Sequence, residues 1–375
     1  MSHILVKIYT PQELNHSSYI QTGLFELERD SFLKTEVVLS LAKRLGTIRI
    51  TESGLNQTNQ PHPKTSFYEL TDAKSGKKIT FATDLYDASD SFSAYALEHC
   101  DYVFKRNFEA KKIEKLPEEA RQKIHPLGLV FGTHSKYQKQ SYKFLLGLLL
   151  ANLRIDAKPD RNFLKRILFS YRKQMSHWKF TRTSRLIGQF EEITPYTENS
   201  ILFQTRCFQS EEQEDVRQIH GQRYRIILAL KEKFQEKFKG GIISSPMAAE
   251  KYKEALTNLP TDPVSYLNLV KSAKIVIYTR GLLHSPAWKM PEYLSQGKII
   301  VAEKLTAELP VSLEHGKEVL FFDQESQIIP LIEEALENEA LCEKLSRNAK
   351  KYFDTHVHPK ENVQRILTFM LNSKE

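Results

Sequence analysis

Short apolar segments alternate with longer amphipathic segments along the second half of the chain. The apolar segments carry the β-branched and aromatic residues of buried strands, at 199–207, 242–244, 274–279, 298–302 and 318–322. Segments with helical spacing separate or follow them, at 211–239, 249–256, 264–272, 291–296, 327–337, 339–353 and 359–371. Apolar strands that alternate with helices predict a parallel sheet with helices on both of its faces.

The first half of the chain has a looser alternation. It predicts strands at 4–9, 47–51, 79–83, 101–105 and 124–129 and helices at 35–45 and 93–100. Gly46 follows the predicted helix 35–45, and glycine is favoured directly after the last residue of a helix. The turn 74–77 (KSGK) is suited to a hairpin. Strands and helices in this order are typical of an open α/β sheet.

A polar segment with a proline and no periodicity, 191–198 (EEITPYTE), separates the two halves. A chain of 375 residues is long enough for two domains of about 150–200 residues. We predict an N-terminal α/β domain at 1–190 that ends in a basic helical extension at about 136–189. A C-terminal domain follows at 191–355, and the last helix lies within 356–375.

Positive charge is unevenly distributed. The chain has 54 Lys and Arg against 46 Asp and Glu, but from Lys136 to Arg185 thirteen basic residues face only Asp156 and Asp160. A local field of that sign attracts phosphate, whether on a nucleotide, a lipid head group or a nucleic acid. Glycine is sparse, at 14 residues of 375, which argues against an ATPase with a glycine-rich phosphate loop.

The cysteines, the histidines and the apolar segments indicate which cofactors and which cellular compartment to expect. The three cysteines are widely spaced, and His356 and His358 have no third ligand nearby in the sequence, so we expect no disulfide, no metal and no cofactor. Met1 leads into an apolar strand without a signal-peptide pattern, and the longest apolar run, 144–150, is far shorter than the ~20 residues that span a bilayer. We expect a cytoplasmic protein.

The segment after the strand 274–279 carries the strongest chemical pattern, because ligands of doubly wound sheets lie beyond the carboxyl ends of the strands. It reads RGLLHSPAWKMPEYLSQGK, and Pro291 is suited to the first turn of a helix. The free N–H groups of such a turn attract an anion. Three nearby side chains could complete a cradle for a diphosphate: Arg280, Ser285 and Lys289.

Glu292, in the same turn, is an acceptor-only group that can bind both hydroxyls of a ribose. Each of these residues also has a structural interpretation. A glutamate in the first turn of a helix complements the helix dipole, and Lys289 can be a solvated surface residue. Together, at the end of a buried strand, they favour a nucleotide site.

Residues 272–320 resemble the donor-binding region of the group 1 glycosyltransferases, which have the GT-B fold. The resemblance lies in the order strand, R-G, loop, K-x-P-E-Y-L-x-x-G-K, strand and V-L-F-F strand. It implies two Rossmann-like domains that face a cleft, with a C-terminal helix that crosses back to the N-terminal domain. It also implies that Glu292 binds the donor's ribose. The family's earlier glutamate, eight positions before, is replaced by His284, which can hydrogen-bond a sugar hydroxyl or a phosphate.

Residues 199–208 are similar to the first strand of the family's donor domain. They place Arg206 at a strand end, where family members often hold a basic residue that binds phosphate.

In the N-terminal half, Asp84 follows the strand 79–83 and is the first candidate for a general base, although a helix-capping role fits it equally. Lys105 and Arg106 could contact an acidic or phosphorylated acceptor, or could form a surface turn.

Aromatic residues lie among Lys and Arg in the segment 163–185. Three interpretations remain open: an ordinary helix with a charged solvent face, a patch that lies on an anionic membrane surface, and a nucleic-acid-binding surface. An anionic membrane would suit an enzyme that builds a lipid-linked glycan at the inner face of a membrane.

The pattern as a whole predicts an enzyme that transfers a sugar from a nucleotide-sugar donor to a glycan or lipid-linked acceptor, in the synthesis of a polysaccharide or surface glycan. The glycan assignment rests on the family resemblance. The alternative is a non-catalytic or nucleic-acid-binding α/β protein that uses the basic segment, although nucleic acid is the less favoured partner. A sugar-phosphate enzyme such as an epimerase would need an acid–base pair, of which only His284 is evident.

Overall fold

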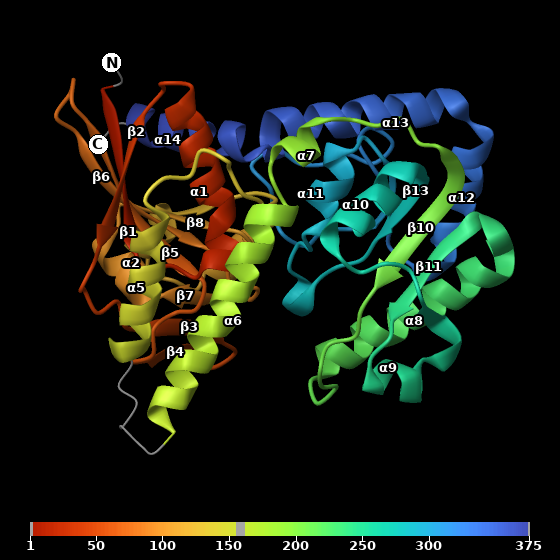
Figure 1. Ribbon diagram of the computed structural model, residues 1–375, viewed down its shortest axis with the longest axis horizontal. Coiled ribbons are helices and arrows are strands. Elements are labelled where there is room, and N and C mark those ends of the chain that lie inside the picture. Colours follow the sequence, from red (N-terminus) through yellow and green to blue (C-terminus); the bar gives the residue numbers. More distant parts are fainter. Residues whose placement is uncertain (1–2, 155–161, 374–375) are drawn as a thin grey trace. The chain divides into compact units, whose positions relative to one another are not determined.

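The computed structural model describes residues 3–154 and 162–373, which form two compact units (Figure 1). Unit 1 contains the described residues up to Ile187, together with Ala307–Pro310 and those from Val357 onward. Unit 2 contains Gly188–Thr306 and Val311–His356. The chain therefore passes from unit 1 to unit 2 at residues 187–188, where the sequence predicted 190–191. No helix among the described residues is both long and apolar enough to cross a membrane.

Unit 1 is built on a six-stranded sheet of order β2-β1-β5-β6-β8-β9. Its strands are β1 (Ile4–Thr10), β2 (Lys34–Leu39), β5 (Thr65–Asp72), β6 (Lys78–Asp84), β8 (Tyr102–Lys105) and β9 (Ile124–Pro126). The sheet is mixed, because β5 runs antiparallel to both β1 and β6. The predicted turn at 74–77 connects β5 to β6 as a hairpin. A smaller antiparallel sheet contains β3 (Thr47–Thr51), β4 (Gly54–Thr58) and β7 (Ser91–Ser93).

The helices of unit 1 include the last helix of the chain. They are α1 (Leu14–Arg29), α2 (Ala94–His99), α3 (Ala110–Ile113), α4 (Glu118–Lys123), α5 (Ser141–Arg154), α6 (Phe163–Ser184) and α14 (Pro359–Asn372). Helix α14 packs against α1, so the chain ends in unit 1, as the sequence predicted. Gly23 of α1 permits a close approach, because a Cβ there would overlap the carbonyl oxygen of Pro359 and Cγ2 of Val363.

One prediction for the first half of the chain was wrong, and one helix was missed. The helix expected at 35–45 is the strand β2, which pairs in parallel with β1 from Lys34 to Leu39. Its Thr-Glu-Val-Val run favours a strand once a partner strand is available. Helix α1 was missed because it buries polar as well as apolar residues. Thr22 donates to the carbonyl oxygen of Ser18 at 2.7 Å, for example, so its hydroxyl is satisfied inside the unit.

Unit 2 has a six-stranded sheet of order β12-β11-β10-β13-β14-β15, and every neighbouring pair in it is parallel. The strands are β10 (Glu198–Thr205), β11 (Phe238–Ile243), β12 (Leu256–Thr257), β13 (Ala273–Tyr278), β14 (Ile299–Glu303) and β15 (Leu320–Phe322). The helices are α7 (Gly188–Glu191), α8 (Glu214–Phe234), α9 (Pro246–Lys251), α10 (Pro263–Ser272), α11 (Lys289–Ser295), α12 (Ile328–Glu337) and α13 (Glu339–Tyr352). The predicted parallel sheet is confirmed.

Strand β11 begins earlier than the sequence suggested. Gly240 and Gly241, expected at the end of a helix, lie inside the strand with φ angles of 153° and 142°. A Cβ at Gly240 would overlap the carbonyl oxygen of Phe203 in β10. The two glycines therefore serve the close pairing of β11 with β10, in a backbone conformation that other residues rarely adopt.

The packing of α1 on α14 gives a direct test. We expect Gly23→Ala to lower the free energy of unfolding by about 1–3 kcal/mol, because the added methyl group collides with backbone that cannot rotate away. Urea unfolding measures the change. Gly221→Ala in α8 is the control, since its Cβ would approach only the end of the Arg225 side chain. Equal effects of the two substitutions would contradict the close packing.

Candidate functional site

The order of the strands in unit 2 reverses between β10 and β13. After β10 the chain continues into β11 and β12 on one side of the sheet, and it then returns to β13 on the other side. Connections that diverge in this way leave a crevice beyond the carboxyl ends of the two central strands, where ligands of such sheets bind. Arg206 follows β10 directly, and Thr279 and Arg280 follow β13. We call this region the β10–β13 site.

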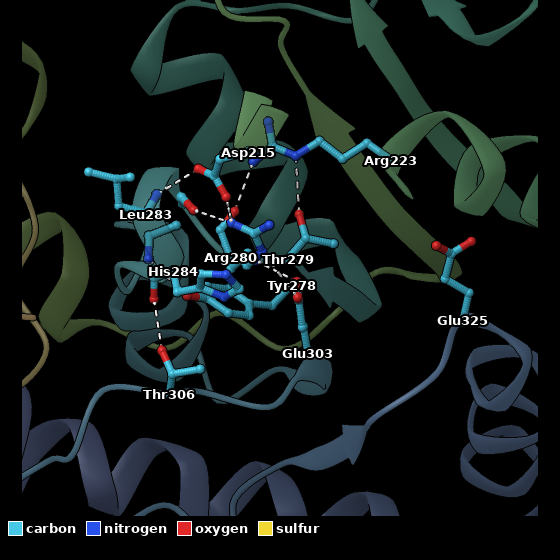
Figure 2. A network of polar contacts seen from close by, with 12 residues as sticks. Asp215, Arg223, Tyr278, Thr279, Arg280, Leu283, His284, Glu303, Thr306 and Glu325 are labelled. Atoms are coloured by element: carbon cyan, nitrogen blue, oxygen red, sulfur yellow. Dashed lines mark hydrogen bonds and ion pairs between the residues drawn. The ribbon is translucent and has the colours of Figure 1, made fainter. Parts of the chain in front are cut away.

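Arg223 of α8 lies across the ends of both strands (Figure 2). Its guanidinium donates to the carbonyl oxygens of Arg206 and Arg280, both at 3.1 Å, and to the hydroxyl of Thr279 at 3.3 Å. The residue is buried, and burial lowers the pKa of Arg223 to about 10. Cys207 and Glu303 oppose this shift, whereas Arg206 and Arg280 add to it. A guanidinium remains charged at that pKa, so Arg223 brings a buried positive charge to the site.

Lys289, the first residue of α11, adds a second cation. Its ammonium group donates to the carbonyl oxygen of Gln204 in β10 and lies 4.9 Å from the centre of the Tyr266 ring. Desolvation lowers the pKa of Lys289 to about 7, and the positive charges of Arg223 and Arg206 contribute, whereas Glu292 opposes them. The proximity of several positive charges therefore favours release of the lysine's proton.

Arg206 supplies the third cation and is exposed. Within residues 3–154 and 162–373, no ion pair joins Arg206, Arg223 or Lys289 to a carboxylate. Buried charges are costly unless they are paired, so this excess of positive charge favours a bound anion. Sequence analysis predicted Arg206 and Lys289 but missed Arg223. One feature of the sequence could have identified Arg223. It lies on the apolar stripe of α8, between Ile219 and Ile226, where a solvent-exposed arginine is not expected.

Arg280 has a different environment from the one predicted for a diphosphate ligand. Its Nη1 lies 2.5 Å from Oδ1 of Asp215, its Nε lies 3.6 Å from Oε1 of Glu303, and its backbone N–H donates to the Glu303 carboxylate at 2.9 Å (Figure 2). Two carboxylates thus neutralise its charge. The geometry makes Arg280 an anchor between the start of α8 and the end of β14, rather than a member of the phosphate cradle.

The loop between β13 and α11 is strained and held in place. Leu283 and His284 have φ angles of 53° and 57°, in the left-handed region that costs a non-glycine residue of order 1–3 kcal/mol. The N–H of Leu283 donates to Asp215 at 2.8 Å, and the carbonyl oxygen of His284 accepts from Thr306 at 3.3 Å (Figure 2). The His284 side chain is exposed, whereas Ser285 is buried.

Glu292 lies in α11 and is only 5% exposed. The helix begins at Lys289, two residues earlier than the sequence suggested, so Pro291 is its third residue and Glu292 its fourth. It ends at Ser295, and Gly297 beyond it has a φ of 55°, as expected for a glycine that terminates a helix. The structure therefore brings Glu292 and Lys289 together on one short helix of the β10–β13 site, close enough to interact electrostatically.

In unit 1, Asp84 and Lys105 contact each other in the interior. The Lys105 ammonium lies 2.9 Å from Oδ2 of Asp84, and Nε2 of His62 lies 3.3 Å from the same oxygen. Both members of the Asp84–Lys105 pair are at most 1% exposed. Burial alone would raise the pKa of Asp84, but Lys105 and then His62 hold it well below its ordinary value. A carboxylate in this state is a weak base with no access to solvent, so the geometry gives Asp84 a structural role.

Arg106, also predicted on the acceptor side, is almost fully buried and forms an ion pair with Asp87. Lys64 approaches the other oxygen of Asp87 at 2.6 Å. Burial would raise the pKa of Asp87, but Arg106 and Lys64 hold it below its ordinary value. This pair of cations around one carboxylate lies where β6 and β8 end.

A histidine that sequence analysis missed lies at the same edge of the unit 1 sheet. His16 is in the first turn of α1, directly after β1, and its Nδ1 is 2.6 Å from Oε2 of Glu13. The same carboxylate accepts the N–H groups of Asn15 and His16 and so caps the helix. Both side chains are partly exposed. A carboxylate on Nδ1 fixes the orientation of the imidazole.

Among the described residues, no group of three or more His, Cys, Asp or Glu could hold a metal ion.

The family match lies mainly in unit 2. Residues 217–368 match the model of a family described as "Glycosyl transferase-like", so the resemblance predicted for the C-terminal half is confirmed there. The matched span begins within α8 and includes Arg223, Lys289 and Glu292. No curated protein sequence matches the chain.

Several solved structures are similar to the chain. The C-terminal domain of LpcC, a glycosyl transferase group 1 family protein from Francisella tularensis, is 14% identical and covers 44% of this chain and 88% of that one, with a TM-score of 0.31. TarM is 9% identical over 98% of each chain, with a TM-score of 0.39. HepE from Anabaena, in complex with UDP-glucose, is 9% identical over 73% of this chain and 79% of that one, with a TM-score of 0.35. At these scores the superpositions are loose.

The pKa of Lys289 predicts a pH dependence of stability. The pKa falls from 10.5 to about 7 on folding, so between these values the unfolded chain binds more protons and stability rises with pH. We expect Lys289→Met to be more stable than the native chain. The difference in stability should be largest at pH 7 or below and should shrink as the pH rises to about 9. Thermal unfolding across this range measures it, with Lys344→Met on the exposed face of α13 as control. A margin that does not change with pH would contradict the assignment.

Proposed function

We propose that this protein is a glycosyltransferase that binds a nucleotide-sugar donor at the β10–β13 site. The observation that carries the proposal is the set of three cations, Arg206, Arg223 and Lys289, at the switch point of a parallel sheet, none of which forms an ion pair with a carboxylate among the described residues. A diphosphate is the anion that such a set would neutralise. The match of residues 217–368 to a glycosyl transferase-like family supports the reaction class.

The donor's parts are assigned from this geometry. The diphosphate faces Arg206, Arg223 and Lys289, and the buried carboxylate of Glu292 accepts hydrogen bonds from the ribose hydroxyls. His284 and Ser285 lie on the strained loop beside the site and are assigned to the sugar and its phosphate. Arg280, Asp215 and Glu303 do not touch the donor but hold that loop in place.

In the proposed reaction, the bond between the sugar's anomeric carbon and the diphosphate oxygen breaks, and a bond from the acceptor's hydroxyl oxygen to that carbon forms. Negative charge develops on the leaving diphosphate. Cations that are already in place stabilise this charge without rearranging during the reaction, which is the most effective form of electrostatic catalysis. The acceptor hydroxyl loses its proton to a base, and both products are released.

For that base we propose His16 in place of Asp84. His16 lies at the carboxyl edge of the unit 1 sheet, is partly exposed and has its imidazole oriented by Glu13 at 2.6 Å. The acceptor class is proposed as a glycan or a lipid-linked glycan in the synthesis of a polysaccharide or surface glycan. This finer assignment is supported only by the resemblance of residues 272–320 to the group 1 glycosyltransferases.

Nucleotide binding tests the donor site. We expect one of UDP, GDP, ADP, dTDP or CMP to stabilise the native chain, by about 2.7 kcal/mol at 100 times its dissociation constant. Glu292→Gln and Lys289→Gln should weaken binding at least tenfold, since each removes a contact to the ligand. Thermal-shift and calorimetric titrations measure this, with Lys344→Gln as control. The donor assignment fails if no nucleotide binds, or if all three variants bind as the native chain does.

Acceptor activation is tested separately. We expect His16→Ala to lower kcat at least a hundredfold while nucleotide affinity stays unchanged, because general-base catalysis contributes about 10²–10⁴-fold. Glu13→Gln should have a smaller effect in the same direction. The measurement is sugar transfer with the donor that the binding screen identifies, and His99→Ala on α2 is the control, an exposed histidine with a carboxylate neighbour. Unchanged kcat in His16→Ala would remove His16 from the mechanism.

A further inference from the structure

Helix α6 presents a long solvent-exposed face with an unusual composition. Its inner face packs into unit 1 through Ile167, Trp178 and Thr181, which are all buried. Residues on the opposite side are exposed over most of the helix, from Leu164 to Thr183. In Figure 1, α6 extends beside α5, and the two helices are in contact.

Large apolar side chains are concentrated on this exposed face. Leu164 is 69% exposed, Leu168 is 50% exposed and Phe169 is 71% exposed. Tyr142 and Leu146 of the adjacent α5 are 65% and 41% exposed. Of the sixteen exposed large hydrophobic residues in the described part of the chain, seven lie in the segment 137–180. Apolar residues that cluster in this way mark a surface that is buried in use.

The same face carries charge of one sign. Neither α5 nor α6 contains an Asp or Glu. Lys165, Arg172 and Lys179 follow one another at intervals of seven residues, so they form a line along α6. Within residues 3–154 and 162–373, none of these three forms an ion pair with a carboxylate. On a helical projection, Leu164 and Leu168 flank this basic line on one side and Phe169 and Phe180 on the other.

A lipid surface fits this arrangement better than a nucleic acid does. Exposed leucines gain free energy by entering hydrocarbon but offer no stacking surface to a base. Trp178, the best stacking side chain of the helix, is buried, and the Arg182 guanidinium lies 4.4 Å from the centre of its ring. Long Lys and Arg side chains can remain at the level of the head groups while neighbouring apolar side chains insert below them.

We propose that the outer face of α6, with Tyr142 and Leu146 of α5, docks unit 1 onto an anionic lipid bilayer. The basic line provides attraction to the negatively charged head groups, and the apolar residues on its two sides insert into the interface. All of these residues lie in unit 1, so the inference does not depend on the donor site in unit 2. Docking of this kind would place the protein beside a lipid-linked acceptor.

Vesicle co-sedimentation tests the proposal with the full chain. Vesicles of phosphatidylcholine alone are compared with vesicles that contain about 30% phosphatidylglycerol, at low and at raised salt. We expect binding to the anionic vesicles only, and weaker binding as salt increases. K165Q/R172Q/K179Q should lower the partition coefficient roughly a hundredfold, at about fivefold for each cation removed. L164S/L168S/F169S should lower it at least tenfold with no change in net charge.

Control variants separate this surface from net charge. K74Q/K111Q/K112Q removes three exposed lysines elsewhere in unit 1 and should leave vesicle binding nearly unchanged. Circular dichroism and nucleotide binding, measured on every variant, show whether the fold and the donor site are intact. The proposal is overturned if the native chain does not bind anionic vesicles, if it binds neutral vesicles equally, or if the control triple behaves like the α6 triple. Tighter binding to a single-stranded oligonucleotide, lost in the α6 triple, would assign the face to nucleic acid instead.

Discussion

The hydrogen bonds of the Arg223 guanidinium at the carboxyl ends of β10 and β13 are the interaction on which the candidate site depends. They tie α8 to the two strands between which the sheet order reverses. They also bring a buried positive charge to the point where the backbone diverges. Lys289 and Arg206 add charge of the same sign. Burial, and then the positive charges of Arg223 and Arg206, lower the pKa of Lys289 to about 7. Under the proposed function, the anionic donor would offset the electrostatic cost of these charges.

The charged residues of unit 2 divide into two groups with different tasks. Arg280, Asp215 and Glu303 neutralise one another and hold a loop in which Leu283 and His284 have left-handed backbone conformations. In the described part of the chain, the cations of the β10–β13 site have no ion pair with a carboxylate, and the proposed function assigns them to the donor. The distinction is physical: a paired charge fixes geometry, whereas an unpaired one generates a field.

The sequence determined the parts of the fold that depend on neighbouring residues. Runs of β-branched and aromatic residues located β10, β13, β14 and β15, because buried strands are local patterns. The parallel sheet of unit 2 followed from their alternation with helices. Where local preference was ambiguous, as in the segment 35–45, only pairing with β1 decided that it forms a strand.

Only the tertiary structure decided what each charged residue does. Lys105 pairs with Asp84, 21 residues away, and Arg280 pairs with Asp215, 65 residues away. No local sequence pattern could show these pairings. Arg223 was not predicted because its partners lie at the ends of two different strands, 17 and 57 residues away along the chain. The sequence by itself determined the approximate positions of the unit 2 strands and the types of residue that follow them. Folding then decided which charges are paired, buried or accessible, because these depend on contacts between segments that are distant along the chain.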